Sequence, residues 1–327
     1  MQAKPVGGVG VPPLDLKSLV AAADEILVGS ASQVRKLEDS TLTVNGMVIP
    51  VKILEAELAV ELIIKGRPEN KIRVTFIMPE TFIGYHGIPV ASHRIFLLKR
   101  RDSKLEPVSP YYPSLPAADT VEPGVEHMNA FEQVVMHVAA VFYAPAGDLS
   151  DREEALWLLH FVDSPIRLTA FQTASSQDPD LSIRLNAMAE LLAAGDSSVL
   201  PAVKQVLLNP NPQGIPSWRL DEAQQNLSSA LARVKDPQVI PTLTEILKSP
   251  DVRVRRAAVS ALRNTQSDKA LDALLNALHD RDFEVRYWAV VGLAEIMGEN
   301  EWRPLQEAFR SDEPRYIQHW ESVLPNH

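Results

Sequence analysis

Three Asp-x-x-x-Arg segments in the second half of the chain carry side chains whose chemistry is complementary. In each segment an aspartate precedes an arginine by four positions: Asp180 and Arg184, Asp251 and Arg255, and Asp282 and Arg286. An aspartate placed before an apolar helical run accepts hydrogen bonds from the free N–H groups of the first turn. A guanidinium binds a carboxylate through two parallel hydrogen bonds. We therefore predict that these six residues have a structural role in the repeat and do not contact a ligand.

Neighbouring positions on the same helices form a candidate surface for a partner. Two adjacent columns with a step of 31 residues contain Gln225, Arg256, Tyr287 and Gln318, and Asn226, Ala257, Trp288 and His319. Tyr, Trp and Arg are enriched in protein interfaces. We therefore predict partner binding by Gln225, Arg256, Tyr287, Trp288 and Gln318, together with Trp218 in a Pro-rich insertion. Alternatively, Trp288 is core, like its equivalent Ala257, and Trp218 folds back onto its own helices.

Motifs for catalysis, cofactors and metals are absent from the sequence. It contains no His-Glu-x-x-His, no Gly-x-Ser-x-Gly and no Gly-x-x-x-x-Gly-Lys segment. The chain has no cysteine, which excludes disulfides, thiolate nucleophiles and Cys-based zinc sites. Residues 7–10 are Gly-rich but follow no predicted strand, so they do not form a nucleotide-binding fingerprint. We expect a protein that is not an enzyme and that has no cofactor and no metal.

The repeated pairs belong to a predicted helical domain that spans residues 126–327. Self-similarity at a period of 31 residues is typical of a solenoid of helical hairpins, each of which buries its apolar face against its neighbours. We count about five hairpins, more than the three or so that stability requires. Between residues 184 and 224 the step is 40, which places an insertion of about nine residues at 209–218.

The first part of the chain is predicted to be rich in β-structure. Residues 1–13 are expected to be a disordered tail, and residues 14–106 alternate apolar and polar positions as strands of a barrel do. The predicted strands are 25–31, 41–49 with a hairpin turn at Asn45-Gly46, 51–64, 71–77 and 92–99. Residues 107–125 are Pro-rich and are expected to form a linker, or alternatively a strap packed against its own barrel.

The two central repeats carry a family resemblance. Asp251, Val254, Arg255, Ala258 and Leu262 recur as Asp282, Val285, Arg286, Ala289 and Leu293. This pattern resembles the short bacterial HEAT repeat of the phycobilisome-lyase type, and the resemblance covers about 150–325. It implies a right-handed α-solenoid in which Arg255 and Arg286 meet carboxylates of adjoining units. Named lyases of this type act on bilins, so a bilin-lyase-like or other small-molecule enzyme working in the solenoid groove is the alternative function.

A second resemblance covers about 20–110 and rests on the runs 23–29, 60–66 and 95–98. These resemble the netrin-like, metalloprotease-inhibitor-like OB fold. Inhibitors of that group use an N-terminal cysteine, which this chain lacks, so the resemblance implies only the barrel. Such modules occur in secreted bacterial proteins, and the Gln-Ala-Lys-Pro start is similar to a tail left after cleavage. We therefore favour an extracytoplasmic location over a cytoplasmic one.

Charge limits the class of partner. The net charge is −10; residues 1–118 carry 14 Lys and Arg against 12 Asp and Glu, whereas residues 119–327 carry 18 against 30. An acidic helical region is poorly suited to neutralising phosphates, so a nucleic acid is an unfavourable partner. No apolar run reaches the roughly 18 residues of a membrane span. We expect another protein as the partner, or self-association into a homo-oligomer or filament.

Overall fold

The structure is a computed structural model that describes residues 14–44, 47–67, 71–79, 87–102, 104–120, 124–143, 148–208 and 217–324. The chain forms two compact units, divided between Thr173 and Ala174. The predicted tail 1–13, the Asn45-Gly46 turn and residues 209–216 of the predicted insertion lie outside the described residues.

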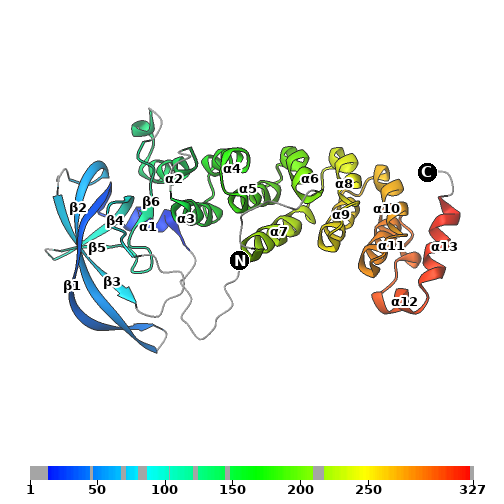
Figure 1. The fold of residues 1–327 in the computed structure, drawn as a ribbon, viewed down its shortest axis with the longest axis horizontal. Coiled ribbons are helices and arrows are strands. Elements are labelled where there is room, and N and C mark those ends of the chain that lie inside the picture. The colour runs from blue at the N-terminus through cyan, green and yellow to red at the C-terminus, as the bar shows by residue number, and fades with distance from the viewer. Residues whose placement is uncertain are drawn as a thin grey trace. The chain divides into compact units, whose positions relative to one another are not determined.

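A sheet organises the first unit (Figure 1). Its strands are β1 (Glu25–Val44), β2 (Met47–Lys65), β3 (Lys71–Pro79), β4 (His93–Arg101), β5 (Lys104–Pro107) and β6 (Leu115–Pro116). The pairs β1–β2, β2–β3, β4–β5, β4–β6 and β1–β4 are antiparallel, whereas β3 and β5 are parallel. The pairings β1–β2–β3–β5–β4–β1 therefore form a closed cycle.

Strand β1 is longer than the sequence pattern predicts. The expected strand 25–31 and the first arm of the hairpin at 41–49 are joined into one element. The intervening polar residues continue the ladder with β2, for example in the pairs Arg35–Glu55 and Lys36–Leu54. A run without alternating hydrophobicity is therefore held in a strand by its neighbour.

Apolar side chains from all the longer strands fill the interior of this unit. Leu58, Val74, Phe96 and Leu98 are fully or almost fully buried there. Helix α1 (Leu16–Ala22) begins after Asp15, whose carboxylate accepts a hydrogen bond from the backbone N–H of Ser18. Removing the apolar side chains of this interior from water is the main favourable contribution to folding.

Within the Pro-rich segment, residues 113–118 form a strap that packs against its own unit. Residues 113–118 are buried, and β6 within them pairs with β4. Helices α2 (Ala130–Ala140) and α3 (Leu149–His160) pack against β6, and α2 also contacts α1 and β2. The two compact units divide between Thr173 and Ala174, and the predicted helical domain begins at residue 126, so α2 and α3 belong to both the first unit and that predicted domain.

The second unit is helical. The remaining helices of the chain are α4 (Pro165–Gln177), which crosses the boundary, α5 (Leu181–Ala193), α6 (Leu200–Leu208), α7 (Ser217–Leu231), α8 (Ile240–Ile246), α9 (Val252–Asn264), α10 (Leu271–Ala277), α11 (Phe283–Met297), α12 (Gln306–Ser311) and α13 (Glu313–Val323). Short 3₁₀ turns occur in both units. In the first unit they are η1 (Val125–His127) and η2 (Val141–Tyr143), and in the second η3 (Ser197–Val199), η4 (Pro237–Val239), η5 (Asp268–Ala270) and η6 (Asn300–Trp302).

These helices form two layers (Figure 1). Helices α5, α7, α9, α11 and α13 contact one another in that order, while α8, α10 and α12 each pack against the helix that follows. A continuous core of buried Leu, Val, Ile and Ala side chains runs between the layers from Leu181 to Leu324. None of the helices in the described ranges is long and apolar enough to cross a membrane.

Candidate functional site

Three aspartates are the N-caps of three long helices of the second unit, α5, α9 and α11. Asp180 accepts hydrogen bonds from the backbone N–H groups of Ser182 at 2.9 Å and Ile183 at 3.2 Å. Asp251 accepts one from Arg253 at 2.8 Å. Asp282 accepts two, from the backbone N–H groups of Glu284 at 3.1 Å and Val285 at 3.2 Å. These bonds satisfy donors that a helix start otherwise leaves free.

Two arginines of the repeat motif connect consecutive repeats. Arg255 donates from Nε and Nη2 to the two carboxylate oxygens of Asp280, at 2.8 and 3.0 Å. Arg286 binds both carboxylate oxygens of Glu313 and also donates to the backbone carbonyl of Asp280 at 2.8 Å. The side chains of Arg255 and Asp280 are 5% and 13% exposed. The result is a ladder that runs from the start of α9 to the start of α13.

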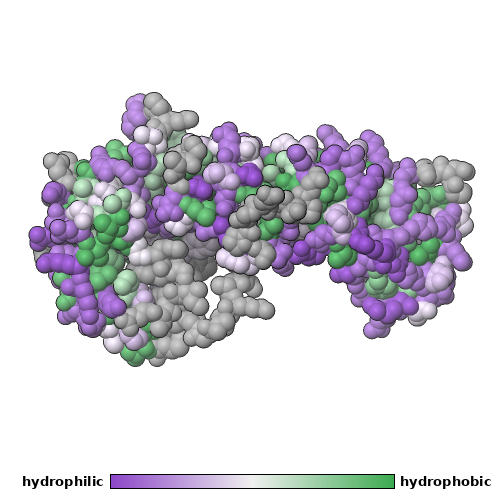
Figure 2. Space-filling view, viewed as in Figure 1, coloured by the Kyte–Doolittle hydropathy of each residue, from purple (hydrophilic) through white to green (hydrophobic). Residues whose placement is uncertain are grey.

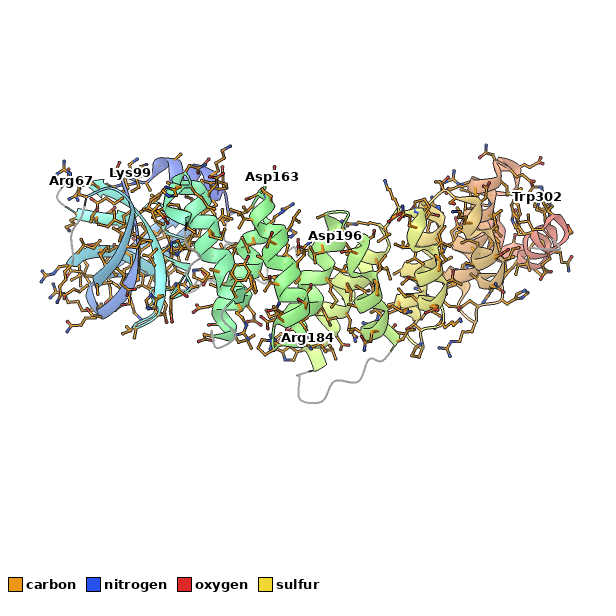
Figure 3. All side chains as sticks on the ribbon, turned by 90° about the horizontal axis from the view of Figure 1, so that it is seen from above. Arg67, Lys99, Asp163, Arg184, Asp196 and Trp302 are labelled. Carbon is orange, nitrogen blue, oxygen red and sulfur yellow. The ribbon has the colours of Figure 1, made fainter. Side chains whose placement is uncertain are left out.

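The ladder has a different form beside the insertion. Arg184 on α5 (Figure 3) donates to the backbone carbonyls of Asp178 and Pro179 in its own turn. The position that matches Asp280 in the inserted repeat, 40 residues after Asp178, is Trp218, which offers no carboxylate. Instead, Arg219 of α7 reaches back to Asp180 at 3.3 Å and to the Ser182 hydroxyl at 2.8 Å. The link therefore reverses direction at this repeat.

The first predicted column lies on the long helices. Three of its members are exposed: Gln225 on α7, Arg256 on α9 and Gln318 on α13. The fourth, Tyr287 on α11, is half-buried. Arg256 is not a free cation, because its Nε and Nη2 lie 2.8 and 2.7 Å from the carboxylate of Asp282. This guanidinium holds the pKa of Asp282 below its ordinary value. One predicted binding residue thus also contacts the N-cap of α11.

Tyr287 and Trp288 form an aromatic pair that is partly exposed. Their rings meet edge to face, with 5.0 Å between centroids. Tyr287 also stacks on Phe283, and its hydroxyl donates to the backbone carbonyl of Pro304 at 3.3 Å. The guanidinium of Arg263 lies 4.9 Å from the centre of the Trp288 ring. Trp288 is half-buried. Its burial is therefore intermediate between the two alternatives from the sequence, a surface residue and a core residue.

Trp218 lies apart from this pair. It is the second residue of α7 and its side chain is 67% exposed, so it does not fold back onto the described helices. It is among the most exposed large apolar residues that the structure describes.

Sequence patterns did not identify a further aromatic cluster at the end of this unit. Trp302, labelled in Figure 3, stacks on His319 with 3.6 Å between ring centroids and 6° between planes. The ring of His319 also lies 3.0 Å from Glu299, and Arg315 covers Trp302 at 5.2 Å. The high aromatic content of residues 302–320 was the available signal. The Asp-x-x-x-Arg motif does not recur in this last repeat, so the motif did not indicate the cluster.

Some charged side chains on the long helices are paired within the chain. Arg253 pairs with Asp251 at 2.7 Å, and Arg263 pairs with Glu295 through two hydrogen bonds. Hydrophilic residues cover most of the visible surface of the repeat unit, with small hydrophobic areas between them (Figure 2). Within the described ranges, no three His, Asp or Glu side chains group closely enough to hold a metal ion.

The family comparison matches this part of the chain. Residues 219–294 and 254–324 fit the family model for HEAT repeats. This segment consists of HEAT-like repeats. It includes the caps Asp251 and Asp282, the Arg255 and Arg286 ladder and the columns on α7 to α13, whereas the Asp180 cap precedes it. No curated protein matches the sequence.

Proposed function

We propose that the chain is a non-enzymatic scaffold whose HEAT-like repeats bind another protein through the face of α7, α9, α11 and α13. The observation that carries this proposal is the partly exposed pair of Tyr287 and Trp288, which lies in register with exposed Gln225, Arg256 and Gln318. Aromatic side chains ringed by polar ones are typical of the energetic centres of protein interfaces. HEAT-like repeats supply the extended surface on which such a centre operates.

A protein partner accounts for this face better than a small molecule does. The Tyr287 hydroxyl and the Arg256 and Arg263 guanidinium groups already bind groups of their own chain. A bilin-lyase-like enzyme or another small-molecule site requires convergent polar groups that are available to the ligand. Recognition of a partner surface can instead use the aromatic rings and the outer edges of these paired side chains.

We infer that the first unit is an OB-like barrel and that the repeats form a right-handed solenoid. The closed cycle of strand pairings, including the parallel β3–β5 pair, supports the barrel. The two layers of successive helices support the solenoid. We also propose an extracytoplasmic location, in keeping with the resemblance of the first unit to modules of secreted bacterial proteins. Cell fractionation tests the location directly.

The binding proposal is tested by quantitative affinity capture with chemical crosslinking in the source organism. Gln225→Arg and Gln318→Arg each place a bulky cation on the proposed face without removing a buried contact. The matched control is Gln238→Arg in η4, which makes the same change at an exposed position next to α8. We expect a defined protein, crosslinked to α9 or α11, to be lost with both face variants and retained with the control. Equal recovery with all three variants would contradict the proposal.

A further inference from the structure

The outer half of β1 has a strand partner on one side only. Strand β4 pairs with residues 25–30, and Ala31 makes an isolated parallel bridge to Val90. From residue 33 to residue 44, β1 pairs with β2 at every position except Leu37, and no other strand of the described ranges pairs with this segment. This part of the β1–β2 ribbon can be followed in Figure 1. Such an edge presents backbone N–H and C=O groups that can accept another strand.

The side chains along this edge are arranged with opposite charges on either side of one apolar residue. The order is Arg35, Lys36, Leu37, Glu38 and Asp39. All five are exposed; the side chains of Arg35 and Asp39 are 65% and 70% accessible. An antiparallel copy of the same segment, aligned so that Leu37 faces Leu37, places Arg35 opposite Asp39 and Lys36 opposite Glu38. A parallel copy in the same alignment would place like charges opposite each other, which is unfavourable.

We propose that two copies of this chain associate through antiparallel pairing of their β1 edges. The contact is isologous, so the same segment serves on both sides of a two-fold axis near Leu37. Strand addition of this kind draws its affinity from main-chain hydrogen bonds and its register from the side chains. This proposal goes beyond the binding role of the HEAT-like repeats and does not depend on it.

Contacts within a single copy do not block this pairing. Lys36 pairs with Asp39 at 2.5 Å and Arg35 pairs with Glu55 at 2.7 Å. Exposed ion pairs contribute little to the stability of a folded chain, so giving them up for ion pairs between copies costs each copy little free energy. A register irregularity between Lys36 and Glu38 leaves Leu37 without a partner in β2. Because irregularities of this kind bend a strand, they limit the length of the shared ladder and favour a closed pair over an open stack.

Sedimentation velocity over a range of concentrations tests the proposal with the full chain. The variants are Arg35→Glu with Lys36→Glu, which makes the edge acidic, and Glu38→Lys with Asp39→Lys, which makes it basic. The control is Lys17→Glu with Lys104→Glu, which changes net charge as the first variant does, at exposed positions away from this edge. Circular dichroism establishes that each variant is folded.

We expect the wild-type chain and the control to form dimers with the same dissociation constant. Each edge variant alone should weaken the dimer by roughly tenfold or more, because like charges then face each other. An equimolar mixture of the acidic and basic variants should restore the dimer. A wild-type chain that stays monomeric at every concentration would overturn the proposal. So would edge variants that dimerise like the wild type, since the interface would then lie elsewhere.

Discussion

Arg255 holds Asp280 of the next repeat by two hydrogen bonds, 2.8 Å from Nε to Oδ2 and 3.0 Å from Nη2 to Oδ1. The same guanidinium donates from Nη1 to the backbone carbonyls of Ser249 and Pro250. One buried side chain therefore joins the turn before α9 to the turn before α11. Neighbouring HEAT-like repeats are coupled through this residue as well as through their apolar core.

Loss of this link should destabilise the repeat unit strongly. Arg255→Met keeps most of the apolar length but leaves the carboxylate of Asp280 without its cation, at an expected cost of about 3–5 kcal/mol in the free energy of unfolding. Urea denaturation measures the change. Arg253→Met, which breaks an exposed ion pair with Asp251, should cost less than about 1 kcal/mol. Similar losses in the two variants would contradict a special role for Arg255.

Arg94 should hold helix α3 against the sheet. It is 1% exposed and binds Asp151 at 2.8 Å and Glu154 at 2.7 Å, both on α3. Arg94→Met leaves two carboxylates without their cation, which we expect to cost about 3–5 kcal/mol. Hydrogen exchange should become faster in residues 149–160. Arg101→Met on the same strand removes an exposed, longer ion pair and should leave that exchange unchanged. Unaltered exchange in the Arg94 variant would refute the assignment.

His137 should make the first unit sensitive to mild acid. Its ring is 4% exposed, neither nitrogen has a hydrogen-bond partner within the described residues, and burial lowers its pKa. The unfolded chain, with a histidine pKa of about 6.5, therefore binds a proton more readily than the folded chain does. Stability contributed by neutral His137 is present above that pH and declines as the pH falls below it.

The matching experiment compares the wild-type chain with His137→Leu by thermal unfolding between neutral and mildly acidic pH. The variant should lose less stability over this interval, because it no longer has a buried base to protonate. His127→Leu changes an exposed histidine in the same unit and is the control. If all three proteins show the same dependence on pH, His137 is not the responsible group.

Gly29 should tolerate no side chain. A Cβ at this position would lie 2.2 Å from the backbone oxygen of Ala59 on β2, at a point where the β1–β2 register is irregular. Gly29→Ala must push the strands apart, and overpacking of this kind typically costs about 1–3 kcal/mol. Gly195→Ala is the comparison: its φ of +88° carries a strain of about 1–2 kcal/mol but no collision. Separation of β1 and β2 in the Gly29 variant should appear as faster hydrogen exchange in both strands, and unchanged exchange would contradict the collision.

Local features of the fold follow from short stretches of sequence. The N-caps formed by Asp180, Asp251 and Asp282 involve residues two or three positions apart, so their contacts could be predicted without knowing the rest of the chain. The pairing of β1 with β2 was also predictable from nearby residues, because the ladder starts with Val44 and Met47, which are three positions apart. The resemblance of the central repeats to the HEAT type implied that Arg255 would meet a carboxylate of the adjoining unit, and Arg255 does bind Asp280.

Features of the candidate site that depend on distant residues could not be predicted in this way. The sequence placed Arg256 on a surface column, but its pairing with Asp282 depends on how α9 and α11 pack. The burial of the Pro-rich strap depends on β4, and the stacking of Trp302 on His319 depends on α13. These contacts link residues that hydrophobic periodicity treats as independent.

The sequence by itself determined the repeat, the caps, the absence of cysteine chemistry and the acidic character of the helical part, because each is a property of composition or of residues close together in the chain. Only the tertiary structure decided that β1 continues through a polar segment, leaving one edge unpaired within the described residues, and that Tyr287 and Trp288 are half-buried. The physical reason is that strand pairing and partial burial are set by whichever surfaces the folded chain brings together. Neither is encoded by spacing along the sequence alone.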